Sequence, residues 1–140
     1  MKNLLSLSLF ILFQLAAFAQ SKMVEQAVMQ CDSILNLLGK EKDANNKADL
    51  VLSFYGTSID GFPLQLLGLS QKLLDVAKQN NDIYAESAAL TAAGQGYRLT
   101  GNYVKALEFH RKAVGLAEQS GNKLLLGFAI NQMEIGRAHV

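Results

Sequence analysis

The chain matches itself, without a gap, when it is shifted by forty residues. The segment 70–82 falls on 110–122, and in the same register Gly61 falls on Gly101. A fixed period of this size is typical of solenoids, in which each unit buries its apolar face only against its neighbours. The self-match therefore predicts a stack of similar units.

The composition favours helices as the building blocks of these units. Half of the 140 residues are apolar, which is enough for one packed domain. Leu and Ala dominate the apolar set, and Pro63 is the single proline. Unbranched side chains and Ala lose little conformational freedom in a helix. We therefore expect an all-α fold.

The second unit, residues 83–121, is predicted to be a pair of helices. The turn between them is expected at 100–102, where Gly101 can adopt the left-handed conformation that ends a helix, and Gly121 supplies the next turn. Apolar and small residues follow a helical spacing on both sides of the first turn. The predicted inward-facing residues are Ala85, Ala88, Ala89, Ala92, Ala93, Gly96 and Tyr97, and then Tyr103, Ala106, Leu107, His110, Ala113, Val114 and Ala117.

The first unit, residues 48–82, is also predicted to be a pair of helices. Its first helix is expected to turn Val51, Phe54, Tyr55 and Ile59 inward, and Pro63 fits the first turn of its second helix, where a missing N–H does little harm. The predicted divisions are a signal peptide at 1–19, an opening helix (24–38) and polar connection within 20–47, repeat units at 48–82, 83–121 and 122–133, and a tail at 134–140.

The first nineteen residues have the features of a secretory signal peptide. Lys2 precedes an apolar run over 4–13, and small residues at Ala17 and Ala19 fit a cleavage site after Ala19. An uncleaved membrane anchor is the alternative, although the run is short for a span and Gln14 interrupts it. We expect an exported mature chain that works in a periplasm or at a cell surface and has no membrane span.

The segment 94–113 resembles a tetratricopeptide repeat. Residues stand where that family places its small and aromatic packing side chains, while Leu90 replaces the usual Trp and the period exceeds the family's usual length of about 34 residues. The resemblance covers roughly 48–133 and implies a right-handed α-solenoid. The matching packing positions are Gly94, Tyr97, Gly101, Tyr103, Ala106 and Ala113.

The resemblance also implies a function in protein or peptide binding. In this family, the first helix of each pair lines a concave groove that holds extended peptides or partner helices. Arg98 is then the natural candidate to bind a carboxylate or a backbone carbonyl of the ligand. An equally open alternative is that these positions face water in a structural spacer. The groove positions that the resemblance implies are Tyr55, Ser58, Thr91, Gln95 and Arg98.

Other kinds of chemistry find little support in the sequence. Thirteen Lys and Arg against twelve Asp and Glu leave no basic stripe for nucleic acid. The single cysteine, Cys31, cannot form an internal disulfide, and His110 has no Cys, Asp or second His at ligand spacing. We therefore predict no catalytic, cofactor-binding or metal-binding residues and no enzyme activity in this chain.

The whole protein is expected to be longer than this chain. Residues 134–140 resemble the translation of a common sequencing adapter, and a Gly is expected at position 134, forty residues after Gly94; a native tail is the alternative. A signal peptide followed by such repeats resembles the sensory arm of Bacteroidetes-type histidine kinases or LuxR-type regulators. The alternatives are a stand-alone periplasmic scaffold or assembly factor and, less favoured, a secreted enzyme whose catalytic residues lie beyond position 134.

Overall fold

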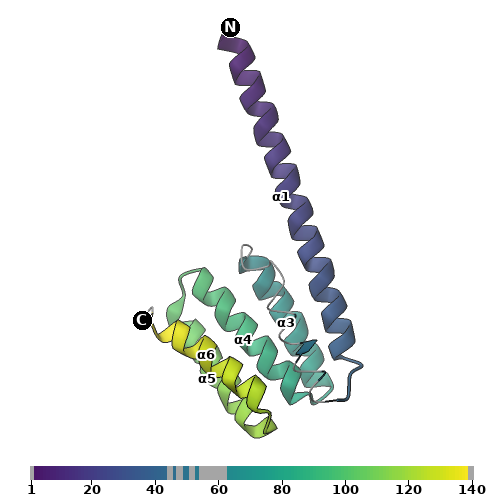
Figure 1. Ribbon diagram of the computed structural model, residues 1–140. Helices are drawn as coiled ribbons and strands as arrows, with labels where there is room; N and C mark the ends of the chain where they lie inside the picture. Colours follow the sequence, from purple (N-terminus) through teal and green to yellow (C-terminus); the bar gives the residue numbers. More distant parts are fainter. Residues whose placement is uncertain (1, 44–45, 47–48, 51–52, 54–62, 139–140) are drawn as a thin grey trace.

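The chain folds into a row of antiparallel helices. The computed structural model describes residues 2–43, 46, 49–50, 53 and 63–138. From α3 onward each helix reverses direction and packs against the one before it, and α4 also contacts α6 (Figure 1). The described ranges contain helices and no strand, which confirms the predicted all-α class. The labelled helices are α1 (Lys2–Leu38), α3 (Pro63–Gln79), α4 (Ile83–Leu99), α5 (Tyr103–Ser120) and α6 (Lys123–Arg137).

The turns lie where the sequence predicts them. Gly101, between α4 and α5, has a φ of 81°, and Gly121, which ends α5, has a φ of 69°. A side chain would strain this left-handed backbone, so glycine suits both positions. Pro63 begins α3, as expected from its position. Local sequence signals therefore set the helix ends.

Side-chain caps begin the helices that follow these turns. The Asn122 side chain accepts a hydrogen bond from the Leu125 backbone N–H at 3.0 Å at the start of α6. Asn102 caps α5 in the same way, through the Lys105 N–H at 3.2 Å. Each cap satisfies a backbone donor that has no partner within its own helix.

We predict that Asn122→Ala lowers the free energy of unfolding by about 1 kcal/mol, because the cap of α6 is lost. Chemical denaturation followed by circular dichroism measures this change. Asn131→Ala, at an exposed position inside α6, is the matched control and should change stability by less than about 0.5 kcal/mol. Equal effects of the two substitutions would show that the cap does not stabilise α6.

Small residues let α4 lie close to both of its neighbours. Its predicted inward face is buried except at Tyr97, which is half-buried, and Ala89 and Ala92 are fully inaccessible. A methyl group built on Gly96 would lie 2.8 Å from Leu67 Cγ of α3. The predicted face of α5 is buried at Ala106, Ala113 and Ala117, but Tyr103 remains 38% exposed. The expectation that Tyr103 packs inward is wrong, because this first residue of α5 lies at the end of the helix pair.

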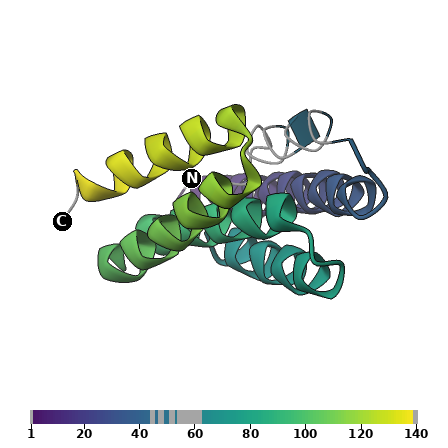
Figure 2. The ribbon, with the colours of Figure 1, turned by 90° about the horizontal axis from the view of Figure 1, so that it is seen from below.

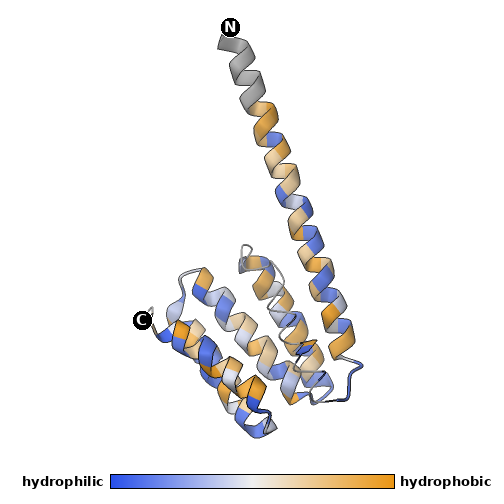
Figure 3. Ribbon diagram, in the orientation of Figure 1, coloured by the Kyte–Doolittle hydropathy of each residue, from blue (hydrophilic) through white to orange (hydrophobic). Residues whose placement is uncertain are grey.

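Helix α1 is continuous across the expected cleavage site. Its C-terminal half contacts α3 and contains the buried residues Ala27, Cys31 and Leu38, whereas the described side chains before Val24 are exposed. Figure 3 shows the apolar residues of this free part extending away from the packed helices. Among the residues that the structure describes, no helix combines the length and the apolar character that crossing a bilayer requires. Cleavage after Ala19 stays a prediction.

Helix α6 forms an outer side of the bundle, with α5 on its inner side (Figure 2). Its backbone continues without a break from 133 into the expected tail and ends at Arg137. The adapter origin of 134–140 therefore stays a prediction. Val51, Phe54, Tyr55 and Ile59, which we expected to face inward in the first unit, lie outside the described residues.

Candidate functional site

The described part of the expected groove lies on one face of α4. Thr91, Gln95 and Arg98 are spaced by four and three residues, which places them on the same side of the helix. Thr91 is 1% exposed and its hydroxyl donates to the Ser87 carbonyl at 2.8 Å; Gln95 is 6% exposed. Of the three side chains, only that of half-buried Arg98 reaches solvent.

The other two groove positions, Tyr55 and Ser58, lie outside the described residues. The groove assignment as a whole therefore stays a prediction. Thr91 and Gln95 are buried, so they can affect such a groove only through packing. Of the three described positions, Arg98 is the most accessible to a ligand in solution.

Arg98 and His110 each have polar side-chain atoms buried in the helix bundle. The Arg98 Nε and both ring nitrogens of His110 are buried without a hydrogen-bond partner among the described residues. Burial of the imidazole, with a smaller contribution from the positive charge of Arg98, lowers the pKa of His110 from its usual value near 6.5 to about 4. His110 is therefore neutral at pH 7.

The His110 ring fills a junction of three helices. A methyl group built on Gly94 of α4 would lie 2.6 Å from its Cε1, and one built on Gly136 of α6 would lie 3.3 Å from its Cδ2. The ring thus lies on the packing face of α5, as the helical spacing predicts. Among the described residues, no group of three or more His, Cys, Asp or Glu side chains could hold a metal ion. The contacts of His110 are those of a packing residue.

The remaining predicted packing residues also join α4 to α5. Ala106 and Ala113 are buried, and the half-buried Tyr97 ring lies 5.1 Å from the Phe109 ring between centroids. The Lys105 ammonium group lies 5.0 Å from the Tyr97 ring centroid, a distance suited to a cation–π contact. Tyr97 therefore links the two helices through its ring.

Sequence reasoning missed one buried link between these helices. The Ser87 hydroxyl donates to the Ala113 carbonyl at 2.9 Å, and both residues are inaccessible to solvent. A buried hydrogen bond of this kind fixes the rotation of α4 about its axis and its position along α5, because breaking the bond would leave buried polar groups unsatisfied. The available signal was a serine at the centre of an alanine-rich helical stripe.

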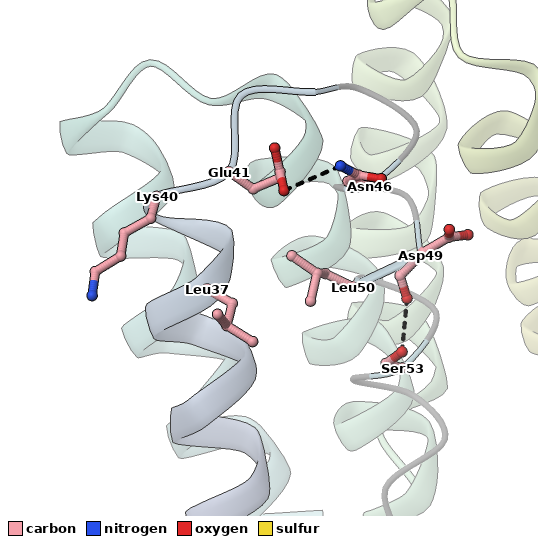
Figure 4. A pocket seen from close by; sticks show the side chains of 7 residues that line it. All are labelled: Leu37, Lys40, Glu41, Asn46, Asp49, Leu50 and Ser53. Carbon is pink, nitrogen blue, oxygen red and sulfur yellow. Dashed lines mark hydrogen bonds between the residues drawn. The ribbon is translucent and has the colours of Figure 1, made fainter.

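A hollow of about 380 Å³ lies between the end of α1 and the segment that follows it (Figure 4). Its prominent carboxylate, Glu41, accepts hydrogen bonds from the backbone N–H groups of Lys42 and Asp43 and from the side chain of Asn46. These bonds, chiefly that from the Asp43 N–H, hold the pKa of Glu41 below its usual value. Glu41 therefore stabilises its own loop and remains ionised at neutral pH.

A second hollow, of about 420 Å³, lies where α3, α4 and α5 meet. Leu90 and half-buried Phe109 contribute apolar surface, and Lys78 and Lys112 contribute positive charge. Lys112 is already bound to Glu108 at 2.7 Å on the same helix. Both side chains are more than half exposed, as on a solvated helix face.

Comparison of the chain with protein-family models, with curated proteins and with solved structures gives no match.

Proposed function

We propose that this chain is a tetratricopeptide-like α-solenoid module that binds a protein or an extended peptide. The observation that carries the proposal is a burial pattern that recurs at the period of the sequence. A recurring pattern of burial is expected when similar helix pairs stack in the same way.

The recurrence is clearest on the second helix of each pair. Four of the six buried residues of α3 have a buried counterpart forty positions later on α5, and the other two, Leu69 and Leu74, have half-buried counterparts. The buried pairs are Leu66 with Ala106, Ser70 with His110, Leu73 with Ala113, and Ala77 with Ala117.

The first helices repeat as well. Asp82 caps α4 through the Ala85 N–H at 3.1 Å, and forty residues later Asn122 caps α6 through the Leu125 N–H at 3.0 Å. Buried residues again pair at this spacing: Ala85 with Leu125, and Ala89 with Ala129. Matched caps and matched burial support stacked units better than an irregular helical bundle.

The proposed ligand contact is Arg98, whose guanidinium group can bind a carboxylate or a backbone carbonyl. Peptides selected from a displayed library of random extended peptides provide the probe. Arg98→Ala should weaken binding of the selected peptides by about tenfold or more, measured by isothermal titration calorimetry, because a charge-assisted hydrogen bond is lost. The melting curve should show that the variant remains folded.

Arg111→Ala is the matched control, because Arg111 is an exposed arginine of α5 outside the proposed groove. Its peptide affinity should equal that of the parent chain. If both variants bind like the parent, Arg98 has no role in binding; if no peptide is selected, a structural spacer becomes the better account.

We further propose that the module is the exported part, periplasmic or at the cell surface, of a sensor histidine kinase or LuxR-type regulator. The support is the signal-peptide pattern before the repeats. The alternative is a stand-alone periplasmic scaffold or assembly factor. Long-read sequencing of source DNA across the codon for Glu134 separates them: a membrane helix and an output domain downstream support the sensor, whereas further repeats alone support the scaffold.

A further inference from the structure

One end of the helix row exposes apolar side chains to solvent. Leu64, the second residue of α3, is 72% exposed, and Val104, the second residue of α5, is 76% exposed. Leu99 at the end of α4 and Tyr103 at the start of α5 are also exposed. We call these four residues the apolar end, because they lie where α3 and α5 begin and where α4 ends.

The exposure recurs at the period of the sequence. Leu64 and Val104 are forty residues apart, and α3 and α5 both pack against α4 and run in the same direction (Figure 1). Equivalent positions of stacked units lie on the same side of a solenoid. Leu64 is exposed although α1 precedes it and α4 and α5 follow it, so a missing neighbour does not explain the exposure.

The packed part of helix α1 starts at the same end. Asp32 of α1 and Lys72 of α3, again forty residues apart, form an ion pair at 3.9 Å. Because α1 and α3 run in the same direction, Val24 and Leu64, each eight residues before a member of that pair, lie at the same level (Figure 1). Lys22 is exposed just before this level, and the free part of α1 extends past the apolar end. An attached signal peptide therefore holds the apolar end near the membrane.

The charges at the apolar end are positive. The described segments 63–66 and 96–106 contain Arg98 and Lys105 and no Asp or Glu. By contrast, the turn at the other end of α3 and α4, at 78–86, combines Lys with Asp and Glu. Exposed apolar side chains among cations suit a bilayer surface with anionic headgroups, because the acyl chains accept the apolar groups and the headgroups attract the cations.

We propose that the apolar end is a membrane-surface site that binds lipids with anionic headgroups. Leu64 and Val104 enter the boundary between headgroups and acyl chains, and Lys22 and Lys105 pair with the headgroups. Such a contact lies on the bilayer and needs no helix that crosses it. The inference does not depend on peptide binding.

Binding to lipid vesicles tests the proposal with the chain that begins at Gln20, the expected mature form. The described side chains from 10 to 23 are exposed, so removing 1–19 takes away no packing contact that the structure describes. We expect cosedimentation with vesicles of phosphatidylglycerol and phosphatidylcholine in equal parts, and weaker binding to phosphatidylcholine alone. Added salt should reduce the binding. Circular dichroism checks that the chain and its variants keep their helices.

Two substitutions with matched controls locate the contact. Val104→Glu should weaken binding to the mixed vesicles at least about tenfold, because a negative charge would face the anionic surface. Leu124→Glu adds the same charge at a 52% exposed apolar position at the other end of the row and should leave binding unchanged. Lys105→Gln should weaken binding about fivefold, whereas Lys123→Gln, at the start of α6, should not.

A tryptophan placed at the apolar end reports insertion, because the chain has no tryptophan of its own. The fluorescence of Val104→Trp should shift to shorter wavelength on the mixed vesicles, and that of Leu124→Trp should not. The absence of vesicle binding even at low salt, or equal effects of Val104→Glu and Leu124→Glu, would overturn the proposal. In the first case, a protein partner becomes the better occupant of the apolar end.

Discussion

Replacing Gly94 by valine is expected to lower the free energy of unfolding by about 3 kcal/mol. The first added carbon would lie 2.6, 2.7 and 2.9 Å from three ring atoms of His110, closer than unbonded atoms can approach. The ring has little room to withdraw, because Gly136 of α6 also approaches it. The substitution must therefore push α4 and α5 apart or displace α6. Chemical denaturation measures the loss.

Gly68→Val is the matched control for this experiment. Gly68 lies inside α3, and a methyl group there would meet no atom within 4 Å. Its replacement should change the stability by less than about 0.5 kcal/mol. In the background of His110→Ala, Gly94→Val should cost at least about 1 kcal/mol less than in the parent chain, since the two positions are in contact. An equal cost in both backgrounds would contradict the proposed clash.

Lowering the pH from 7 to 5 is expected to remove about 2 kcal/mol of stability through His110 alone. Its pKa falls to about 4 in the folded chain, from a usual value near 6.5, because burial and the Arg98 charge disfavour the imidazolium form. The unfolded chain therefore binds the proton more readily. The part of the free energy of unfolding that depends on a neutral His110 is fully present above pH 6.5. It decreases as the pH falls from 6.5 toward 4.

Denaturation curves at several pH values measure this effect, with His110→Leu as the variant that cannot titrate. The variant should lose about 2 kcal/mol less than the parent between pH 7 and pH 5, whatever its own stability. Glu41 and Glu108 have lowered pKa values, so their stabilising effect is lost mainly below this range. Arg98→Ala should reduce the acid effect, because one cause of the low pKa of His110 is gone. Parallel pH profiles of parent and His110→Leu would contradict the assignment.

The sequence predicted the helices and turns of 83–122 well because their causes are local. Gly101 and Gly121 lie in the left-handed backbone that ends a helix, and Asn122 satisfies a backbone donor only three residues away. The alanine stripe of α4 is buried as its spacing predicts. Each of these signals acts within one or two helical turns, so a single segment carries enough information.

The candidate site was less predictable. Arg98 is accessible in part, as the groove interpretation requires, but Thr91 and Gln95 are buried. Their exposure depends on helices that are remote in the sequence, and no local pattern distinguishes a groove position from a covered one. The Ser87–Ala113 hydrogen bond has the same origin, because it needs two helices at one particular height and rotation.

The sequence by itself determined that this chain forms helices, where those described between 63 and 122 begin and end, and which side of each is apolar. These properties follow from backbone conformation, capping and side-chain spacing, all of which act over a few residues. Only the tertiary structure decided that Tyr103 stays exposed and that His110 lies between glycines of two other helices. Burial and the low pKa of His110 arise from contacts between residues far apart in the chain, and these exist only after the helices have packed.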